Sequence, residues 1–137
     1  VVGDTHGCYT EFSRLLDKIN PDLSNDKLVM LGDYIDRGPQ SWEMVNSIID
    51  LQKTYGKEHV ILLRGNHEQM AIDFYKHKNS NFLFNGAKSS LMSFKRNNDS
   101  LRNYIDFFEG LPLYHEDSSF KIRTVSDTLT GRDAEAI

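Results

Sequence analysis

Short apolar runs alternate along this chain with stretches whose apolar residues recur at helical spacing. The two clearest runs, residues 27–31 and 59–63, are almost wholly apolar, as expected for buried strands of a parallel sheet. An earlier strand ends at Val2. The helical spacing predicts helices over residues 10–19, 41–56 and 68–77. The order β-α-β-α-β-α predicts an α/β fold, a β-α-β-α-β core with parallel strands, right-handed crossovers and helices on the sheet faces.

Local signals predict where two of these helices begin and end. The first helix is expected to stop before Asn20, because the residue that precedes a proline is disfavoured in helical geometry. Ser41 is expected to be the N-cap of the second helix, since its hydroxyl can accept a hydrogen bond from a free backbone N–H. Gly56 is a suitable C-terminal stop for the same helix.

The second half of the chain has a different pattern. Residues 79–112 are helical in spacing and rich in aromatic residues, with a polar interruption at 95–100. We interpret this segment as a helical cap whose aromatic side chains, Phe84 among them, fill a core and do not form a ligand site. One more strand is expected within residues 114–122. The rest has few apolar residues, so we predict a partial domain at 1–122 and an atypical, disordered tail at 123–137.

Composition narrows the class of protein. A length of 137 residues fits one domain, and a net charge of −4 gives no basic surface for nucleic acid. No apolar run approaches the ~20 residues of a membrane helix, and a single cysteine, Cys8, cannot form an internal disulfide. We therefore expect a cytoplasmic protein with no nucleic-acid or membrane partner. Because only Val1 and Val2 precede the first glycine, we interpret the chain as a fragment that has lost part of its first strand.

Carboxylates, histidines and arginines follow the apolar runs in three blocks. These are Gly-Asp-Thr-His-Gly at 3–7, Gly-Asp-Tyr-Ile-Asp-Arg-Gly at 32–38 and Arg-Gly-Asn-His-Glu at 64–68. Because ligands bind at the carboxyl ends of parallel strands, we expect the three blocks to converge. Aspartate, imidazole and amide donors suit Mn, Fe or Zn. The pattern indicates a site for two metal ions and phosphate ester hydrolysis.

The glycines of the blocks have a role of their own. Gly3, Gly32 and Gly65 each follow a strand, where a residue without a side chain allows a sharp turn and the close approach of a ligand.

The blocks resemble those of the calcineurin-like metallophosphoesterases, and specifically of their phosphoprotein phosphatase branch. The resemblance covers residues 1 to about 70. The segments 85–87, Asn-Gly-Ala, and 111–113, Leu-Pro-Leu, are also similar to bacterial and phage-type phosphatases. The resemblance implies a metallophosphoesterase-like fold and an enzyme that hydrolyses phosphoric monoesters. The expected function is that of a serine/threonine protein phosphatase whose substrate is a phosphoprotein or phosphopeptide.

The resemblance also implies the metal ligands. Asp4, His6 and Asp33 would bind one divalent ion, and Asp33 and Asn66 would bind a second. Asp33 lies in the middle block and has two oxygens, which suits a bridge between the ions.

The remaining residues of the blocks would carry out catalysis and bind phosphate. The resemblance makes His67 the general acid that protonates the leaving alkoxide, with Asp36 orienting and charge-tuning it, so that these two form the catalytic pair. Arg37 and Arg64 would bind phosphate oxygens through their guanidinium groups. Structural alternatives stay open, because Asp36 can cap a turn and Arg64 can pair with a carboxylate. We interpret Glu68 as structural.

Two histidines of the family pattern are missing. Family members complete the second metal site with histidines from later strands, and neither block is present here. His59, His77 and His115 lie at unsuitable positions, so we interpret them as solvated or packing residues. The chain therefore lacks the C-terminal part of the usual sandwich, either because it was cut or altered or because it is a natural short relative. We expect an incomplete second site, tighter binding at the first, and little phosphatase activity.

Two other functions remain open. The first is a dinucleoside polyphosphate hydrolase of the same superfamily, although by resemblance the symmetrical enzymes typically lack the aspartate found here at position 36. The second is a degenerate, non-catalytic module that binds metal or phosphate. Comparing the hydrolysis of a phosphopeptide with that of diadenosine tetraphosphate separates the two enzymes. Measuring the metal bound after loading tests the non-catalytic module. The native metals, the substrate and the oligomeric state do not follow from the residues.

Overall fold

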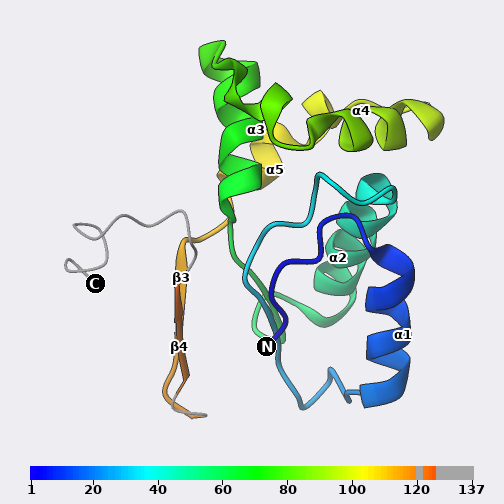
Figure 1. The fold of residues 1–137 in the computed structure, drawn as a ribbon. Helices are drawn as coiled ribbons and strands as arrows, with labels where there is room; N and C mark the ends of the chain where they lie inside the picture. The colour runs from blue at the N-terminus through cyan, green and yellow to red at the C-terminus, as the bar shows by residue number, and fades with distance from the viewer. Residues whose placement is uncertain (120–121, 126–137) are drawn as a thin grey trace.

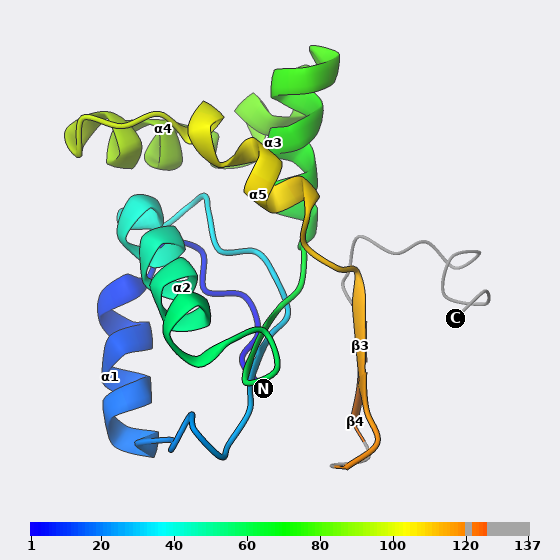
Figure 2. The same ribbon diagram turned by 180° about the vertical axis from the view of Figure 1, so that it is seen from behind.

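A computed structural model describes residues 1–119 and 122–125 of the chain. Its elements are five α-helices, two 3₁₀ helices and two pairs of strands. Both views place α3, α4 and α5 at one end of the molecule and α1 and α2 at the other (Figures 1 and 2). Each helix among the described residues is too short or too polar to cross a bilayer.

A parallel ladder forms the centre of the fold. β1 (Leu28–Met30) pairs in parallel with β2 (Val60–Leu62), and Val2 forms a parallel bridge to Met30 on the other side of β1. The predicted parallel order is confirmed, although both strands are shorter than the apolar runs that predicted them. β1 and β2 are buried along their whole length, which is why the two apolar runs show no alternation of polar residues.

The two faces of this ladder contribute to different parts of the core. Leu28, Met30, Val60 and Leu62 join the main core, whereas Val29 and Ile61 on the other face pack with Leu63. This division follows from the period of two along a strand. The main core is completed by α1 (Tyr9–Ile19) and α2 (Ser41–Tyr55), which lie side by side in Figure 1.

The cap is helical, as predicted. It comprises α3 (Asn66–His77), η1 (Ser80–Phe84), α4 (Ala87–Arg96), η2 (Leu101–Tyr104) and α5 (Ile105–Glu109). Its aromatic core contains Phe82, Phe94 and Phe108, each at most 1% exposed, and it is continuous with the main core. The prediction for Phe84 was wrong, because 82% of that residue is exposed at the end of η1.

A second strand pair follows the cap. β3 (Tyr114–Asp117) pairs antiparallel with β4 (Ile122–Val125), and stands away from the helices in Figure 1. An ion pair between Lys27 and the buried Asp117 ties this hairpin to the start of β1. β4 runs across the predicted domain boundary at residue 122, and the rest of the predicted tail, 126–137, lies outside the described residues. The two-part division stays a prediction.

Two predictions about helix ends need correction. Ser41 is the first residue of α2 and not its cap, because the cap position falls on Gln40, and the Ser41 hydroxyl instead accepts from the backbone N–H of Asp36 at 3.2 Å. Helix α3 begins at Asn66, two residues before the predicted start. Asn66 and His67 therefore lie in the first turn of a helix and not in a loop. The predicted stop of α2 at Gly56 is confirmed.

Candidate active site

Backbone hydrogen bonds join the first two sequence blocks. The N–H groups of Thr5 and His6 both donate to the carbonyl of Asp33, at 3.1 and 2.9 Å, and Gly7 donates to Tyr34 at 2.8 Å. A further bond runs from the N–H of Gly38 to the carbonyl of His6 at 2.9 Å. The loops that follow the first two strands are thus bonded along their length, so His6 and Asp33 face each other.

Glu68 joins the third block to the second. Its fully buried carboxylate accepts hydrogen bonds from the backbone N–H groups of Asp33 and Tyr34, both at 2.8 Å, and of Gly65 at 3.0 Å. Burial, assisted by the charge of Asp33, raises the pKa of Glu68 to about 7 against the lowering effect of these three donors. Glu68 therefore links the ends of β1 and β2, a contact that goes beyond the general structural role interpreted from the sequence.

Glycine is required where these two strand ends meet. Gly32 has a φ of +110°, and a Cβ there would lie 2.2 Å from the backbone nitrogen of Gly65. A Cβ on Gly65 would lie 2.2 Å from Oδ1 of Asp33. At both positions the two strand ends approach each other too closely for a side chain. At Gly3 a Cβ would meet no protein atom within 4 Å, and the expected approach of a ligand there stays a prediction.

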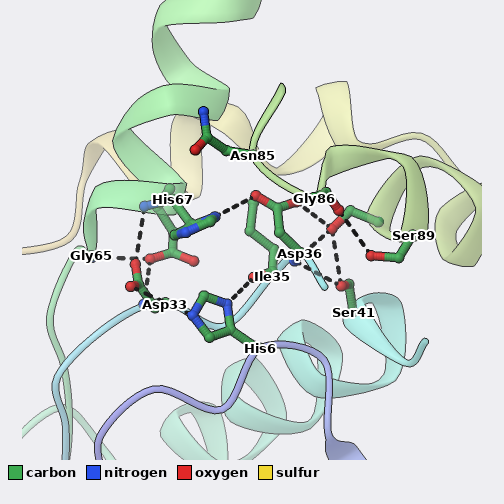
Figure 3. Close-up of polar contacts among 12 residues, drawn as sticks. His6, Asp33, Ile35, Asp36, Ser41, Gly65, His67, Asn85, Gly86 and Ser89 are labelled. Carbon is green, nitrogen blue, oxygen red and sulfur yellow. Dashed lines mark hydrogen bonds and ion pairs between the residues drawn. The ribbon is translucent and has the colours of Figure 1, made fainter. Parts of the chain in front are cut away.

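His6 is oriented as a metal ligand. Its Nδ1 lies 2.8 Å from the carbonyl oxygen of Ile35, which can only accept, so Nδ1 carries the proton and Nε2 has a free lone pair (Figure 3). That Nε2 lies 4.0 Å from Oδ2 of Asp4 and 3.8 Å from Oδ2 of Asp33. Ligands at ~2.0–2.2 Å from one ion lie within ~4.4 Å of each other, and both separations satisfy this limit. The donors present fit a divalent metal.

The two carboxylate oxygens of Asp33 face different residues. Its Oδ1 accepts from the backbone N–H of His67 at 3.0 Å, while Oδ2 faces His6. Donor atoms of His6, Asp33 and His67 all lie within 4.8 Å of one another. The side chain of Asp4, which lies outside this group of three, is 62% exposed. Asn66, the predicted ligand of a second ion, begins α3 directly before His67.

His67 and Asp36 form a buried pair beside this cluster. Nδ1 of His67 lies 2.7 Å from Oδ2 of Asp36, and the two residues are 3% and 0% exposed. Burial is the largest influence on the pKa of His67 and lowers it, but the hydrogen bond to Asp36 and the charges of Asp33 and Asp36 outweigh it and raise the pKa. The ring of His67 stands edge-on to that of His6, with centroids 4.6 Å apart. Its free nitrogen, Nε2, remains for substrate or an ion.

The two predicted phosphate-binding arginines contact neighbouring segments of the site. Arg37 is exposed, and its backbone N–H donates to the carbonyl of Gly86 at 3.2 Å. Its positive charge lowers the pKa of His67, which places the guanidinium within electrostatic range of the pair. Nη1 of Arg64 donates to the side chain of Gln69 at 3.0 Å. Their role in phosphate binding stays a prediction.

Two serines that the sequence interpretation missed complete the surroundings of Asp36. The hydroxyl of Ser90, on α4, donates to Oδ1 of Asp36 at 2.6 Å. The hydroxyl oxygen of Ser41 lies 3.0 Å from the hydroxyl oxygen of Ser90. Both serines are fully buried. A signal for Ser90 exists in the sequence, because it shares a helical face with Ala87 and Phe94, where an apolar residue is expected.

The backbone is strained where the site residues lie. Four of them have left-handed φ angles that residues with a side chain seldom adopt: His6 (40°), Asp33 (53°), Asp36 (72°) and Arg37 (67°). Each such conformation costs on the order of 1–3 kcal/mol and persists only where surrounding contacts hold it. The hydrogen bonds among the three blocks provide those contacts.

A family model, that of the calcineurin-like phosphoesterases, matches residues 1–133 of the chain. The chain belongs to this family. Its fold agrees with the assignment: the chain superposes on a protein serine/threonine phosphatase from Saccharomyces cerevisiae with a TM-score of 0.61 and 25% identity, over 82% of this chain and 32% of that one. The structure of a proposed diadenosine tetraphosphatase matches in fold with a TM-score of 0.63 and 22% identity, over 90% and 47%. The predicted metallophosphoesterase fold is confirmed.

Related sequences within this calcineurin-like family differ in the substrate that their names give. A symmetrical bis(5'-nucleosyl)-tetraphosphatase of Buchnera aphidicola is 32% identical over 121 residues, which are 88% of this chain and 40% of that protein. Serine/threonine-protein phosphatase 1 of Salmonella typhimurium is 41% identical over 73 residues, 53% of this chain and 31% of that protein. The chain thus spans less than half the length of either. The family uses divalent metals and indicates a hydrolase.

Proposed function

We propose that this calcineurin-like phosphoesterase is a metal-dependent phosphomonoesterase that hydrolyses phosphoserine or phosphothreonine in proteins. The observation that supports it is the buried pair of His67 and Asp36 beside the donors of His6 and Asp33. A serine alkoxide is a poor leaving group, so its departure needs a proton donor at the site. An imidazolium whose other nitrogen is held by a carboxylate supplies that donor near neutral pH.

Each residue of the proposed site has its own role in the reaction. Asp36 can only accept, so the hydrogen at Nδ1 of His67 points to it, and the proton for the leaving group comes from Nε2. The raised pKa of His67 keeps this imidazole protonated over a wider range of pH. Asp4, His6 and Asp33 would hold the metal, with Asn66 contributing to a second position. The metal supplies an activated water and positive charge for the phosphate oxygens. Arg37 and Arg64 would bind those oxygens.

The test is Asp36→Asn in the 137-residue chain, assayed with Mn²⁺ and a phosphoserine peptide. Asparagine keeps the shape but turns a donor group or a weaker acceptor toward His67, so kcat should fall by about 100-fold or more, with a smaller change in KM. Asp50→Asn is the matched control, because Asp50 is exposed on α2. Equal turnover by the two variants would show that His67 and Asp36 do not act as an acid pair.

Hydrolysis of dinucleoside tetraphosphates is the second candidate function. It is supported by the Buchnera aphidicola relative, whose similarity extends over 88% of this chain. In that reaction the leaving group is a nucleotide phosphate, which departs with less help from a proton donor than an alkoxide does. The rate of diadenosine tetraphosphate hydrolysis relative to phosphopeptide hydrolysis separates the candidates. A faster reaction with the dinucleotide that persists in Asp36→Asn would favour the second.

A further inference from the structure

Asp36 is held through both of its carboxylate oxygens. Oδ2 accepts from His67 at 2.7 Å, and Oδ1 accepts from the hydroxyl of Ser90 at 2.6 Å. The residue is fully buried. Figure 3 shows Asp36 between the imidazole of His67 on one side and Ser41 on the other.

The hydroxyl of Ser90 binds the backbone of Asp36 as well as its side chain. A hydroxyl has one proton, and the bond to Oδ1 uses it, so the oxygen of Ser90 accepts from the N–H of Asp36 at 2.7 Å. The same reasoning makes Ser41 the donor in its 3.0 Å contact with Ser90. Ser90 therefore holds both the backbone N–H and the carboxylate of Asp36. These bonds help to maintain the unfavourable φ of 72° at Asp36.

The segment that carries Ser90 also holds the neighbouring residue of the loop. The carbonyl of Gly86, which caps α4, accepts from the N–H of Arg37 at 3.2 Å. A Cβ on Gly86 would lie 3.0 Å from Arg37, so the two segments are in close contact. The start of α4 thus holds both Asp36 and Arg37, although 54 positions separate Ser90 from Asp36.

We propose that Ser90 is a positioning residue for the acid of this site: through Asp36 it sets the direction in which Nε2 of His67 points. This inference rests on the function proposed above. Without the Ser90 hydroxyl, Oδ1 of Asp36 is a buried acceptor without its donor, and the carboxylate is free to turn away from His67. Loss of alignment should slow the step that needs protonation and leave substrate binding unchanged.

The experiment is Ser90→Ala in the full chain, with Ser93→Ala as the matched control. Ser93 lies one turn further along α4 and is also fully buried, but its hydroxyl accepts from Trp42 at 3.0 Å and donates to Glu43 at 3.2 Å. Each variant is assayed with a phosphoserine peptide, whose leaving group needs a proton, and with p-nitrophenyl phosphate, whose leaving group does not.

For Ser90→Ala we expect kcat on the peptide to fall by about 10-fold or more at unchanged KM, with little change on p-nitrophenyl phosphate. Ser93→Ala should affect the two substrates equally, and Ser90→Thr, which keeps the hydroxyl, should restore most of the peptide activity. An equal loss on both substrates in Ser90→Ala would overturn the proposal. If that variant does not fold, Ser90→Cys, with similar volume and a weak donor, is held to the same criterion.

A second measurement separates failure of this inference from failure of the proposed function. If the unmodified chain hydrolyses neither substrate, the proposed function has failed. Nuclear magnetic resonance of the zinc-loaded protein then still tests Ser90, because the Nδ1 proton of His67 should exchange with water at least several-fold faster in Ser90→Ala than in Ser93→Ala. Equal exchange rates in the two variants would refute the positioning role.

Discussion

Replacing Glu68 with glutamine tests how the ends of β1 and β2 are held together. The carboxylate accepts three backbone N–H groups: Oε1 binds Tyr34, and Oε2 binds Asp33 and Gly65. Glutamine is isosteric but has one acceptor oxygen and one amide nitrogen that only donates. In its best orientation the oxygen keeps Asp33 and Gly65, and the amide nitrogen faces the N–H of Tyr34.

The expected cost follows from these contacts. One charge-assisted bond is lost, worth about 1.5–3 kcal/mol, and two others become neutral, which costs about 0.5–1.5 kcal/mol each. Removing a buried charge offsets part of the loss, because burial already raises the pKa of Glu68 to about 7. We expect a net loss of about 2–3 kcal/mol from the free energy of unfolding, a large share of the 5–15 kcal/mol typical of a domain.

The assay is urea unfolding at constant pH, followed by circular dichroism. Glu58→Gln is the control, since Glu58 is exposed and its replacement should change the free energy of unfolding by less than about 0.5 kcal/mol. A Glu68→Gln variant as stable as Glu58→Gln would refute the argument. It would mean that the three donors find other acceptors, or that the cost of burying the charge balances the hydrogen bonds.

Three further predictions concern metal binding, pH and the core. His6→Ala should abolish the Mn²⁺-induced stabilisation, about 2.7 kcal/mol at 100 times Kd, while His59→Ala should keep it; an unchanged thermal shift in His6→Ala would contradict the assigned site. Hydrogen bonds from neighbouring side chains hold the pKa of Asp99 below its usual range, so its stabilisation is present above the unfolded pKa of about 3.9 and is lost as the pH falls below it. In urea unfolding, the excess stability of the natural chain over Asp99→Asn should therefore narrow between about pH 5 and pH 3, and a constant difference would contradict this. Tyr34→Phe removes a 2.6 Å hydrogen bond from the tyrosine hydroxyl to the carbonyl of Leu63 and should lower the free energy of unfolding by about 1–2 kcal/mol in the same assay. An unchanged free energy of unfolding would contradict this and would mean that the carbonyl finds another donor.

Local patterns predicted the strands and helices of the parallel core, whereas the single strand expected within residues 114–122 is a pair, β3 and β4. Apolar runs without alternation predicted buried parallel strands, because only a strand covered on both faces can be apolar throughout. The helical spacing predicted α1 and α2 to within a residue of their observed limits. The start of α3 was predicted two residues late because Asn66 and His67 carry no apolar periodicity, although both are helical.

Contacts between distant segments could not be predicted in the same way. The sequence interpretation placed Ser41 in a local cap, whereas its hydroxyl turns toward Asp36 and Ser90. Phe84 was assigned to the core by its residue type, and only the path of η1 exposes it. The direction of the Ser41 hydroxyl and the exposure of Phe84 both depend on which residues lie beside them in the fold. The pattern of residue types along the chain does not contain that information.

The sequence by itself determined the family, the parallel direction of the strands and the three blocks of polar residues that follow them. Three successive blocks of glycine, aspartate, histidine and asparagine carry the family pattern, and parallel strands bring such blocks to one edge of the sheet. Only the tertiary structure decided how these side chains are held: Glu68 across two strand ends, and Ser90 behind Asp36. The physical reason is that a hydrogen bond needs atoms within about 3 Å. Residues 35 and 54 positions apart reach that distance only after the chain has folded.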